Sequence, residues 1–165
     1  MATLGSAATS KTLSIMTAAS AGLAAAVAAI AASESVELAP IEPGHLKAQQ
    51  VAADVAEKTA GVSYPAVYIY CAGLNNVLKE KFRTFSGKAQ MAVEVRVTHD
   101  RLERVYDHLQ YYVAAAIAVL DANRGDWGSG MFYTGGYKVE FGPVKHGGKN
   151  FLQVGKVLFD VDASY

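Results

Sequence analysis

Residues 90–98, QMAVEVRVT, decide the fold more clearly than any other stretch of this chain. Apolar and polar side chains alternate along the segment, which is the period of a β-strand with one buried face. One face carries Met91, Val93, Val95 and Val97, and the other carries Gln90, Glu94, Arg96 and Thr98. We therefore predict a half-buried strand at Gln90–Thr98.

A long amphipathic helix is predicted directly after this strand. Asp100 and Glu103 form the pattern of a capping box, in which an N-cap side chain and a carboxylate three residues later bind backbone N–H groups. Large apolar residues then recur at helical spacing as far as Leu120. The helix is predicted to end near Ala122, before a turn-rich loop around Trp127.

Further strands are predicted on both sides of these two elements. Residues 66–71 are mostly β-branched and aromatic and follow Pro65, which is typical of the start of a strand. Alternating patterns at Tyr137–Phe141 and Phe151–Val161 predict two closing strands, joined by a loop at 142–150.

The first third of the chain is rich in alanine, the residue with the highest helix propensity. Leu23, Val27 and Ile30 fall at helical spacing on one stripe. We predict a helix from about Thr12 to Ser33. An alanine coat allows close approach of another backbone, so these three residues are candidates for contact with a neighbouring subunit.

An extended connector and a second helix are predicted next. Pro40 and Pro43 interrupt the helical pattern, whereas residues 45–60 are apolar on one face and are followed by Gly61, a C-cap signal. The whole order predicts an α+β fold, a small and mostly antiparallel sheet packed against a long helix. We divide it into an N-terminal helical arm and linker at 1–43 and an α+β domain at 44–165.

Composition narrows the possible functions. The 165 residues include 15 Lys and Arg and 15 Asp and Glu, so no overall field attracts nucleic acid or an anionic membrane. The single Cys71 excludes an internal disulfide, and no zinc-ligand spacing is present. We expect no membrane association and no sequence-specific nucleic-acid binding.

No residue is predicted to be catalytic, to bind a cofactor or to ligate a metal. The sequence lacks the G-x-S-x-G, Walker, G-x-G-x-x-G and H-E-x-x-H patterns. Its four histidines are scattered, and Glu103, Arg104 and Asp107 follow the mixed-sign pattern of an exposed helix face. An enzyme with an unrecognised site requires polar residues to cluster in the fold.

Two kinds of segment are predicted to contact partners. Residues 79–88 form a basic, aromatic excursion between two strands, and long loops in compact domains are often functional, although a solvated hairpin tip is the alternative. The candidates there are Lys79, Lys81, Phe82, Arg83, Phe85 and Lys88. Glycine-flanked aromatic and basic residues in later loops add Trp127, Lys145, His146 and Lys149.

Between Tyr64 and Asp162 the layout of strands, basic loop and helix resembles the tail terminator, or tail completion, proteins of long-tailed bacteriophages. Residues 82–88 (FRTFSGK) and the Gly-Pro and Gly-Gly turns between Tyr137 and Asp162 carry the resemblance most closely.

The resemblance implies a non-enzymatic virion protein, assembled in the host cytoplasm into a hexameric ring that caps the tail tube and joins it to the head or neck. Lys79–Lys88 would contact the tube or the lumen, through which DNA could pass. The opposite face would meet neck or connector proteins, and copies would close the ring by a head-to-tail contact.

Two other functions stay open at this point. The first is another subunit of the phage neck or head–tail connector. The second is an exported periplasmic binding domain, because Lys11 and an apolar run ending near Ala29-x-Ala31 imitate a leader at residues 1–33. The run is weakly hydrophobic and too short to span a bilayer, so we favour a packed helix.

Overall fold

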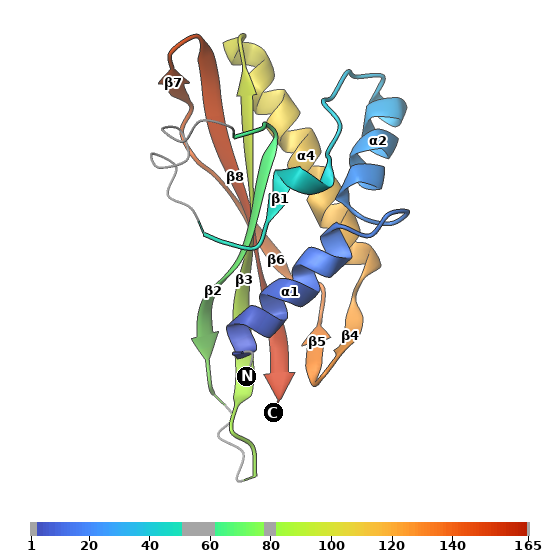
Figure 1. Ribbon diagram of the computed structural model, residues 1–165, viewed down its shortest axis with the longest axis vertical. Coiled ribbons are helices and arrows are strands. Elements are labelled where there is room, and N and C mark those ends of the chain that lie inside the picture. Colours follow the sequence, from blue (N-terminus) through green and yellow to red (C-terminus); the bar gives the residue numbers. More distant parts are fainter. Residues whose placement is uncertain (1–2, 51–61, 78–81, 165) are drawn as a thin grey trace.

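The computed structural model of the protein describes residues 3–50, 62–77 and 82–164 (Figure 1). The helices are α1 (Leu4–Met16), α2 (Leu23–Glu34) and α4 (Leu102–Ala122), with a 3-10 turn, η1 (Pro43–His45). The strands are β1 (Leu46–Lys47), β2 (Ala66–Asn75), β3 (Ser86–His99), β4 (Gly125–Gly128), β5 (Met131–Tyr133), β6 (Tyr137–Phe141), β7 (Lys145–Gly147) and β8 (Asn150–Ser164).

These strands form one mixed sheet in the order β1-β2-β3-β8-β5-β4, and β6 and β7 also pair with β8. Every pairing is antiparallel except that of β1 with β2. The centre of the sheet is the long β3–β8 ladder, which runs from Ser86 opposite Ser164 to His99 opposite Phe151. The predicted α+β fold, with a mostly antiparallel sheet against a long helix, is confirmed.

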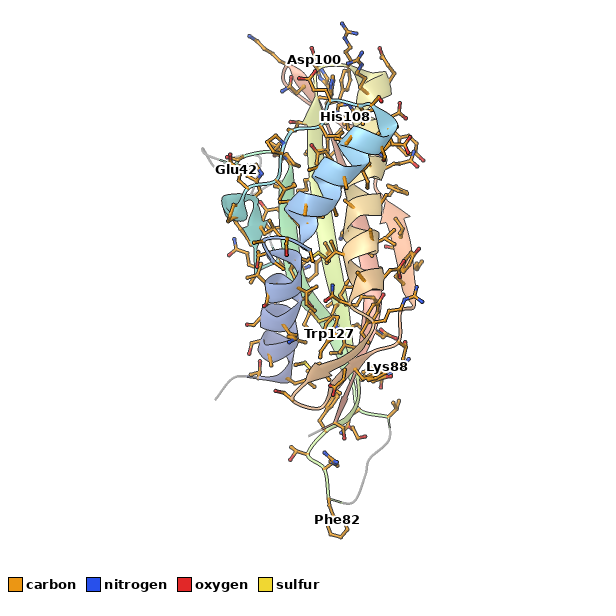
Figure 2. All side chains as sticks on the ribbon, turned by 90° about the vertical axis from the view of Figure 1, so that its right-hand side faces the viewer. Glu42, Phe82, Lys88, Asp100, His108 and Trp127 are labelled. Atoms are coloured by element: carbon orange, nitrogen blue, oxygen red, sulfur yellow. The ribbon has the colours of Figure 1, made fainter. Side chains whose placement is uncertain are left out.

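The main core lies between one face of the sheet and the helices. Met91, Val93, Val95 and Val97 of β3 point into it, as the alternating pattern predicts. Helix α4 packs on β3 and β8, α1 packs on β2 and β3, and α2 packs on α4 (Figure 2).

The N-terminal helices α1 and α2, predicted as part of an arm at 1–43, pack against the rest of the fold. Ala8 and Met16 of α1 and Leu23 and Val27 of α2 are buried in the same core as the strands. These two helices cover apolar surface of the sheet and of α4, so removal of residues 1–33 would uncover the core.

Strand β3 is buried on both faces, which corrects the prediction of a half-buried strand. On the face away from the helices, Glu94 is 5% exposed and Arg96 is 2% exposed. A second small cluster of Ala66, Tyr68, Tyr70 and Ala92 lies on this outer face. Period-two alternation is therefore present, but residues 91–97 are buried on both faces, and the outer face combines Glu94 and Arg96 with apolar and aromatic side chains.

The alanine-rich region contains two helices, where the sequence predicts one from about Thr12 to Ser33. The chain turns between Met16 and Leu23, and the N–H of Gly22 donates to the carbonyl of Ala18 at 2.9 Å. A Cβ on residue 22 would lie 2.3 Å from that oxygen, so the turn requires glycine. The sequence pattern does not reveal this turn, because the alanines on both sides of it favour a helix.

The predicted helix at 45–60 is wrong over its first residues. His45 ends η1, and Leu46 and Lys47 form β1, which pairs with Val67 and Tyr68 of β2. Pairing with the edge of β2 overrides the helical pattern here. Residues 51–60 of this prediction lie outside the described residues.

Helix α4 has the predicted length but a different start. Its N-cap is Arg101, which makes no side-chain cap hydrogen bond, so the capping box of Asp100 and Glu103 does not form. The backbone N–H of Arg101 instead donates to Nδ1 of His99 at 3.0 Å. The end at Ala122 is as predicted.

Two predicted loops contain strands. The segment around Trp127 is a hairpin of β4 and β5, and β7 lies within the predicted loop at 142–150. Strands β5 and β7 pair directly with β8, and β4 pairs with β5. Strand β8 is 15 residues long, so its backbone can form hydrogen bonds with several short strands. Short strands of this kind depend on the partner strand, which local sequence does not reveal.

Gly155 allows α4 to cross β8 at close range. A Cβ at this position would lie 2.9 Å from Cγ2 of Val113 and 3.3 Å from Cδ1 of Leu109. We expect Gly155→Ala to lower the free energy of unfolding by about 1–3 kcal/mol through overpacking, measured by urea denaturation. Gly136→Ala, where no atom lies within 4 Å, is the matched control, and equal effects of the two substitutions would refute the explanation.

Candidate functional site

Phe82, in the described segment just before β3, lies at one extremity of the elongated molecule (Figure 2). The side chain of Phe82 is 96% exposed, which leaves almost all of its apolar surface in water. Arg83 beside it is also exposed. A projecting, solvent-exposed phenylalanine is a typical contact residue for a protein partner.

The six residues predicted for this segment have different positions. Phe85 packs against the main core, and Lys88 lies within β3, where its ammonium is 3.4 Å from Oδ2 of Asp160. The strand begins at Ser86, so the connection is shorter than predicted. Lys79 and Lys81 lie outside the described residues, and Phe82 and Arg83 form the projecting part.

Other exposed apolar side chains lie at the same end of the molecule. Leu74 lies near the end of β2, Val77 follows this strand, and Phe132 lies on β5. Val77 and Phe132 line one open groove of about 410 Å³ together with Lys88 and Asp162. We call Leu74, Val77, Phe82 and Phe132 the apolar tip.

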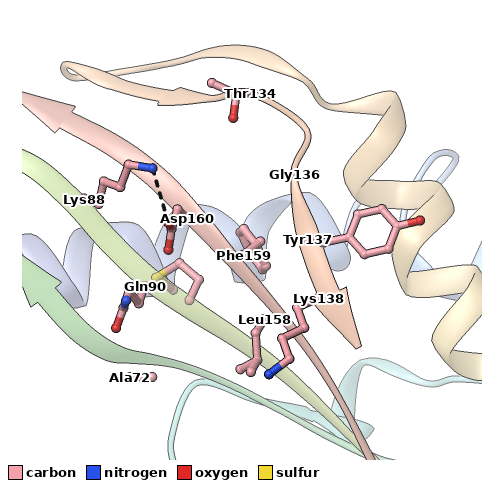
Figure 3. Close-up of a pocket in the computed structure, with 11 residues that line it drawn as sticks. Ala72, Lys88, Gln90, Thr134, Gly136, Tyr137, Lys138, Leu158, Phe159 and Asp160 are labelled. Atoms are coloured by element: carbon pink, nitrogen blue, oxygen red, sulfur yellow. Dashed lines mark hydrogen bonds and ion pairs between the residues drawn. The ribbon is translucent and has the colours of Figure 1, made fainter. Parts of the chain in front are cut away.

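A second groove, of about 420 Å³, crosses the outer face of the sheet (Figure 3). Side chains from β2, β3, β6 and β8 line it, and the ion pair between Lys88 and Asp160 lies along one side. Tyr137 and Lys138 of β6 form the opposite side. Lys88 and Asp160 are half-exposed, so the groove is a hydrated surface with a satisfied ion pair.

The most buried charges form a network around Glu94 on the same outer face. Arg96 donates to Oε1 of Glu94 from Nε at 2.8 Å and from Nη2 at 2.6 Å. The hydroxyl of Tyr70 donates to Oε2 at 3.1 Å, and the Lys156 ammonium lies 3.3 Å from the same oxygen. The Arg96 guanidinium also lies 4.4 Å from the centre of the Tyr68 ring, a cation–π contact.

The sheet register assembles this network from three strands. Tyr68 is opposite Glu94 across β2 and β3, and Glu94 is opposite Lys156 across β3 and β8. Burial, followed by the Glu94 carboxylate, raises the pKa of Tyr70, so its hydroxyl stays a donor. Burial alone would lower the pKa of Lys156, but Glu94 and Tyr70 together outweigh this effect, so the pKa is raised.

The alternating pattern places Glu94 and Arg96 only on the polar face of a half-buried strand and does not predict this network. The available signal is their spacing of two, which places both on one face of a strand. The partners Tyr70 and Lys156 come from other strands, so only the pairing reveals them. With every Glu94 oxygen occupied by donors, the network is suited to structure and offers no free base.

The predicted partner loops separate into a buried and an exposed group. Trp127 is 6% exposed, packs with Tyr133 and Phe159, and donates from Nε1 to the carbonyl of Asn123 at 2.7 Å. It is a core residue and does not face a partner. In contrast, Lys145, His146 and Lys149 are exposed on the β7–β8 hairpin.

The residues predicted on an intersubunit helix lie within the chain itself. Leu23 and Val27 are buried between α2 and the rest of the core, and Ile30 packs against the same core. The face of α2 left for a neighbour consists of exposed alanines, among them Ala24, Ala28 and Ala32.

The fold brings together two histidines that are nine positions apart. The rings of His99 and His108 meet edge to face, with centroids 5.0 Å apart. Burial, and then the neighbouring His99, lower the pKa of His108, so a neutral ring is favoured there. Among residues 3–50, 62–77 and 82–164, no group of three or more His, Cys, Asp or Glu is arranged to hold a metal ion.

In the described segments, no helix is both long enough and apolar enough to cross a membrane. A comparison with known proteins finds no family model and no curated protein that matches this chain. Within the described part, surfaces that face solvent include the apolar tip, the β7–β8 hairpin with Lys145, His146 and Lys149, and the exposed alanines of α2. Surfaces of this kind are suited to binding macromolecules.

Proposed function

We propose that this protein is a structural subunit of a bacteriophage virion, a tail terminator whose copies form a ring. The ring would cap the tail tube and join it to the head or neck. The observation that carries the proposal is the projecting tip, where Phe82 is 96% exposed four residues before the start of the long β3–β8 ladder. The sequence resemblance supplies the identity of the assembly.

The tip supports a contact with the tail tube on physical grounds. Phe82 offers a large apolar surface, and Arg83 adds a positive charge next to it, a pair of residue types enriched at the centre of protein interfaces. The long antiparallel ladder holds the base of the tip, since Gly87 and Lys88 already lie within paired β3. In this function binding energy closes a ring and stops tube growth, and no bond is made or broken.

We expect the purified protein to form a closed oligomer of six copies, measured by native mass spectrometry and seen as rings by electron microscopy. Closed rings arise because a head-to-tail contact repeats until the last copy meets the first. A strict monomer at high protein concentration would contradict the proposal. Long filaments without closure would contradict the ring but retain the head-to-tail contact.

Phe82→Ala is expected to abolish co-sedimentation of the protein with assembled phage tail tubes. The free energy of unfolding should change by less than about 0.5 kcal/mol, because the side chain is nearly fully exposed. Leu102→Ala is the matched control and should leave tube binding unchanged, because it removes an exposed apolar side chain two residues after Asp100, which lies at the opposite end of the molecule (Figure 2). Wild-type binding by the Phe82 variant would place the contact elsewhere.

A further inference from the structure

One margin of the sheet is open at β6. Within the described residues this strand pairs with β8 alone, and its residues are exposed or partly exposed. Tyr137 and Phe141, at its two ends, are 44% and 41% exposed. An unpaired strand edge presents a row of backbone N–H and C=O groups to solvent, and another β-strand can bind to it.

The direction of the free backbone groups follows from the ladder with β8. The N–H of Gly142 donates to the carbonyl of Val154 at 2.8 Å. In an antiparallel ladder every second residue bonds to the same neighbour, so Glu140 and Lys138 also direct their backbone groups toward β8. The alternate residues direct these groups away from β8: Tyr137, Val139 and Phe141.

The side chains of β6 are divided between the two faces of the sheet. The ring of Phe141 contacts Tyr106 of α4 on the helix side, with centroids 5.8 Å apart. Lys138 and Glu140 lie on the outer face, where their charged groups are 2.7 Å apart. Figure 3 shows the side chains of Lys138 and Tyr137 on opposite sides of the strand. The edge thus offers aromatic surface on one face and a base with an acid on the other.

The sequence of β6, YKVEF, is complementary to itself when two copies run antiparallel. With Val139 opposite Val139 of the second copy, Lys138 lies opposite Glu140 and Tyr137 lies opposite Phe141, in both directions. A shift of one chain by two residues would place two lysines or two glutamates opposite each other. Charges on an edge strand usually prevent pairing, but in the symmetric register these charges favour it.

Other exposed charges near this edge do not oppose the pairing. Glu103 and Asp107 of α4 lie beside Tyr106 in the helix and therefore near the Phe141 end of β6. In the symmetric register, Phe141 lies opposite Tyr137 of the second copy, so the two Phe141 residues are separated by about 14 Å along the strand. This exceeds the screening length of about 10 Å at 0.1 M salt, so these acids do not face their own counterparts.

We propose that β6 of one copy pairs antiparallel with β6 of a second copy across a two-fold axis at Val139. The pairing would add about six backbone hydrogen bonds. It would cover the exposed rings of Tyr137 and Phe141 and join Lys138 and Glu140 of both chains in an alternating set of charges. The contact forms between free chains before rings close. It is separate from the head-to-tail contact of the ring and goes beyond the proposed function.

Val139→Pro tests the backbone part of this contact. The N–H of Val139 faces away from β8, so proline removes no hydrogen bond of the β6–β8 ladder but deletes a donor at the centre of the pairing. We expect the dissociation constant of the dimer to rise by at least about 100-fold. Val139→Thr keeps the N–H and should change it by less than about 10-fold. Sedimentation velocity at protein concentrations below those at which rings close measures the dimer, and circular dichroism must show that both variants are folded.

Charge exchange tests the register. Lys138→Glu places acids opposite acids and Glu140→Lys places bases opposite bases, so each variant should bind itself at least about 10-fold more weakly than the wild type does. A mixture of the two variants again pairs each base with an acid and should form mixed dimers, detected by capture of an untagged chain with a tagged one. Lys47→Glu and Glu34→Lys change the net charge equally at exposed positions outside β6 and should leave self-association unchanged.

The outcomes separate this inference from the proposed function. A wild-type dimer that persists in Val139→Pro and in both charge variants would overturn the pairing of β6. Rings of the wild-type protein with no dimer at lower concentration would also overturn it and leave the ring intact. A dimer that these substitutions abolish, with no ring at high concentration, would support the pairing and contradict the proposed function.

Discussion

Replacing Arg96 with alanine is expected to lower the free energy of unfolding by about 3 kcal/mol. Arg96 and Glu94 have side chains 2% and 6% exposed, so the carboxylate would lose its two closest donors in a region that water reaches poorly. Breaking a buried ion pair by removal of one partner costs ~3–5 kcal/mol. We expect the lower end because Lys156 and Tyr70 would still bind Oε2 of Glu94.

Two comparisons isolate the cause of this loss in urea denaturation. Lys88→Ala removes the base of a half-exposed pair and should cost no more than about 1 kcal/mol. Glu94→Met combined with Arg96→Met removes both buried charges and should be less destabilising than Arg96→Ala alone, because no buried carboxylate is left without its guanidinium. Lys156 loses its partner in this double variant, but its side chain is 39% exposed and water can solvate the ammonium. A cost of Arg96→Ala below about 1 kcal/mol would show that water reaches Glu94.

Replacing Trp127 with alanine is expected to lower the free energy of unfolding by about 3–5 kcal/mol, the usual cost of removing a large buried aromatic side chain. Trp127 fills the space between the end of α4 and the sheet, with ring centroids 5.6 Å from Tyr133 and 6.2 Å from Phe159. The substitution would leave a cavity and an unpaired carbonyl at Asn123.

Two further variants distinguish packing from hydrogen bonding in the β4–β5 hairpin. Trp127→Phe keeps most of the apolar volume and should lower the free energy of unfolding less than Trp127→Ala does. The loss in Trp127→Phe includes about 1 kcal/mol for the missing indole hydrogen bond. Phe132→Ala on the same hairpin removes a half-exposed ring and should change unfolding little. If Trp127→Ala unfolds like wild type but weakens partner binding, the side chain faces a partner instead.

The strongest sequence patterns predict their elements well. Residues 90–98 and 102–122 have clear periods of two and of helical spacing, and both elements form with their apolar faces in the main core. The closing strand at 151–161 is correct and extends further, to Asn150–Ser164. Long periodic segments are reliable because every residue in them favours the same secondary structure.

Weaker segments fail where a distant partner decides the outcome. Leu46 and Lys47 become a strand because β2 offers an edge, and Gly125–Gly128 pairs with β5 although its glycines indicate a turn. The candidate contact residues divide in the same way. Phe82 and Lys145 are exposed, whereas Trp127, Leu23 and Val27 are buried, since exposure depends on what packs over a residue.

By itself the sequence determined the α+β class, the central strand, the long helix and the basic, aromatic segment between β2 and β3. Periodicity, composition and glycine or proline signals depend on neighbouring residues in the chain, so they can be recognised without the tertiary structure. Only the tertiary structure decided that Glu94 and Arg96 are buried together and that α1 and α2 belong to the core. These properties depend on contacts between residues far apart in the chain, which strand pairing and helix packing create.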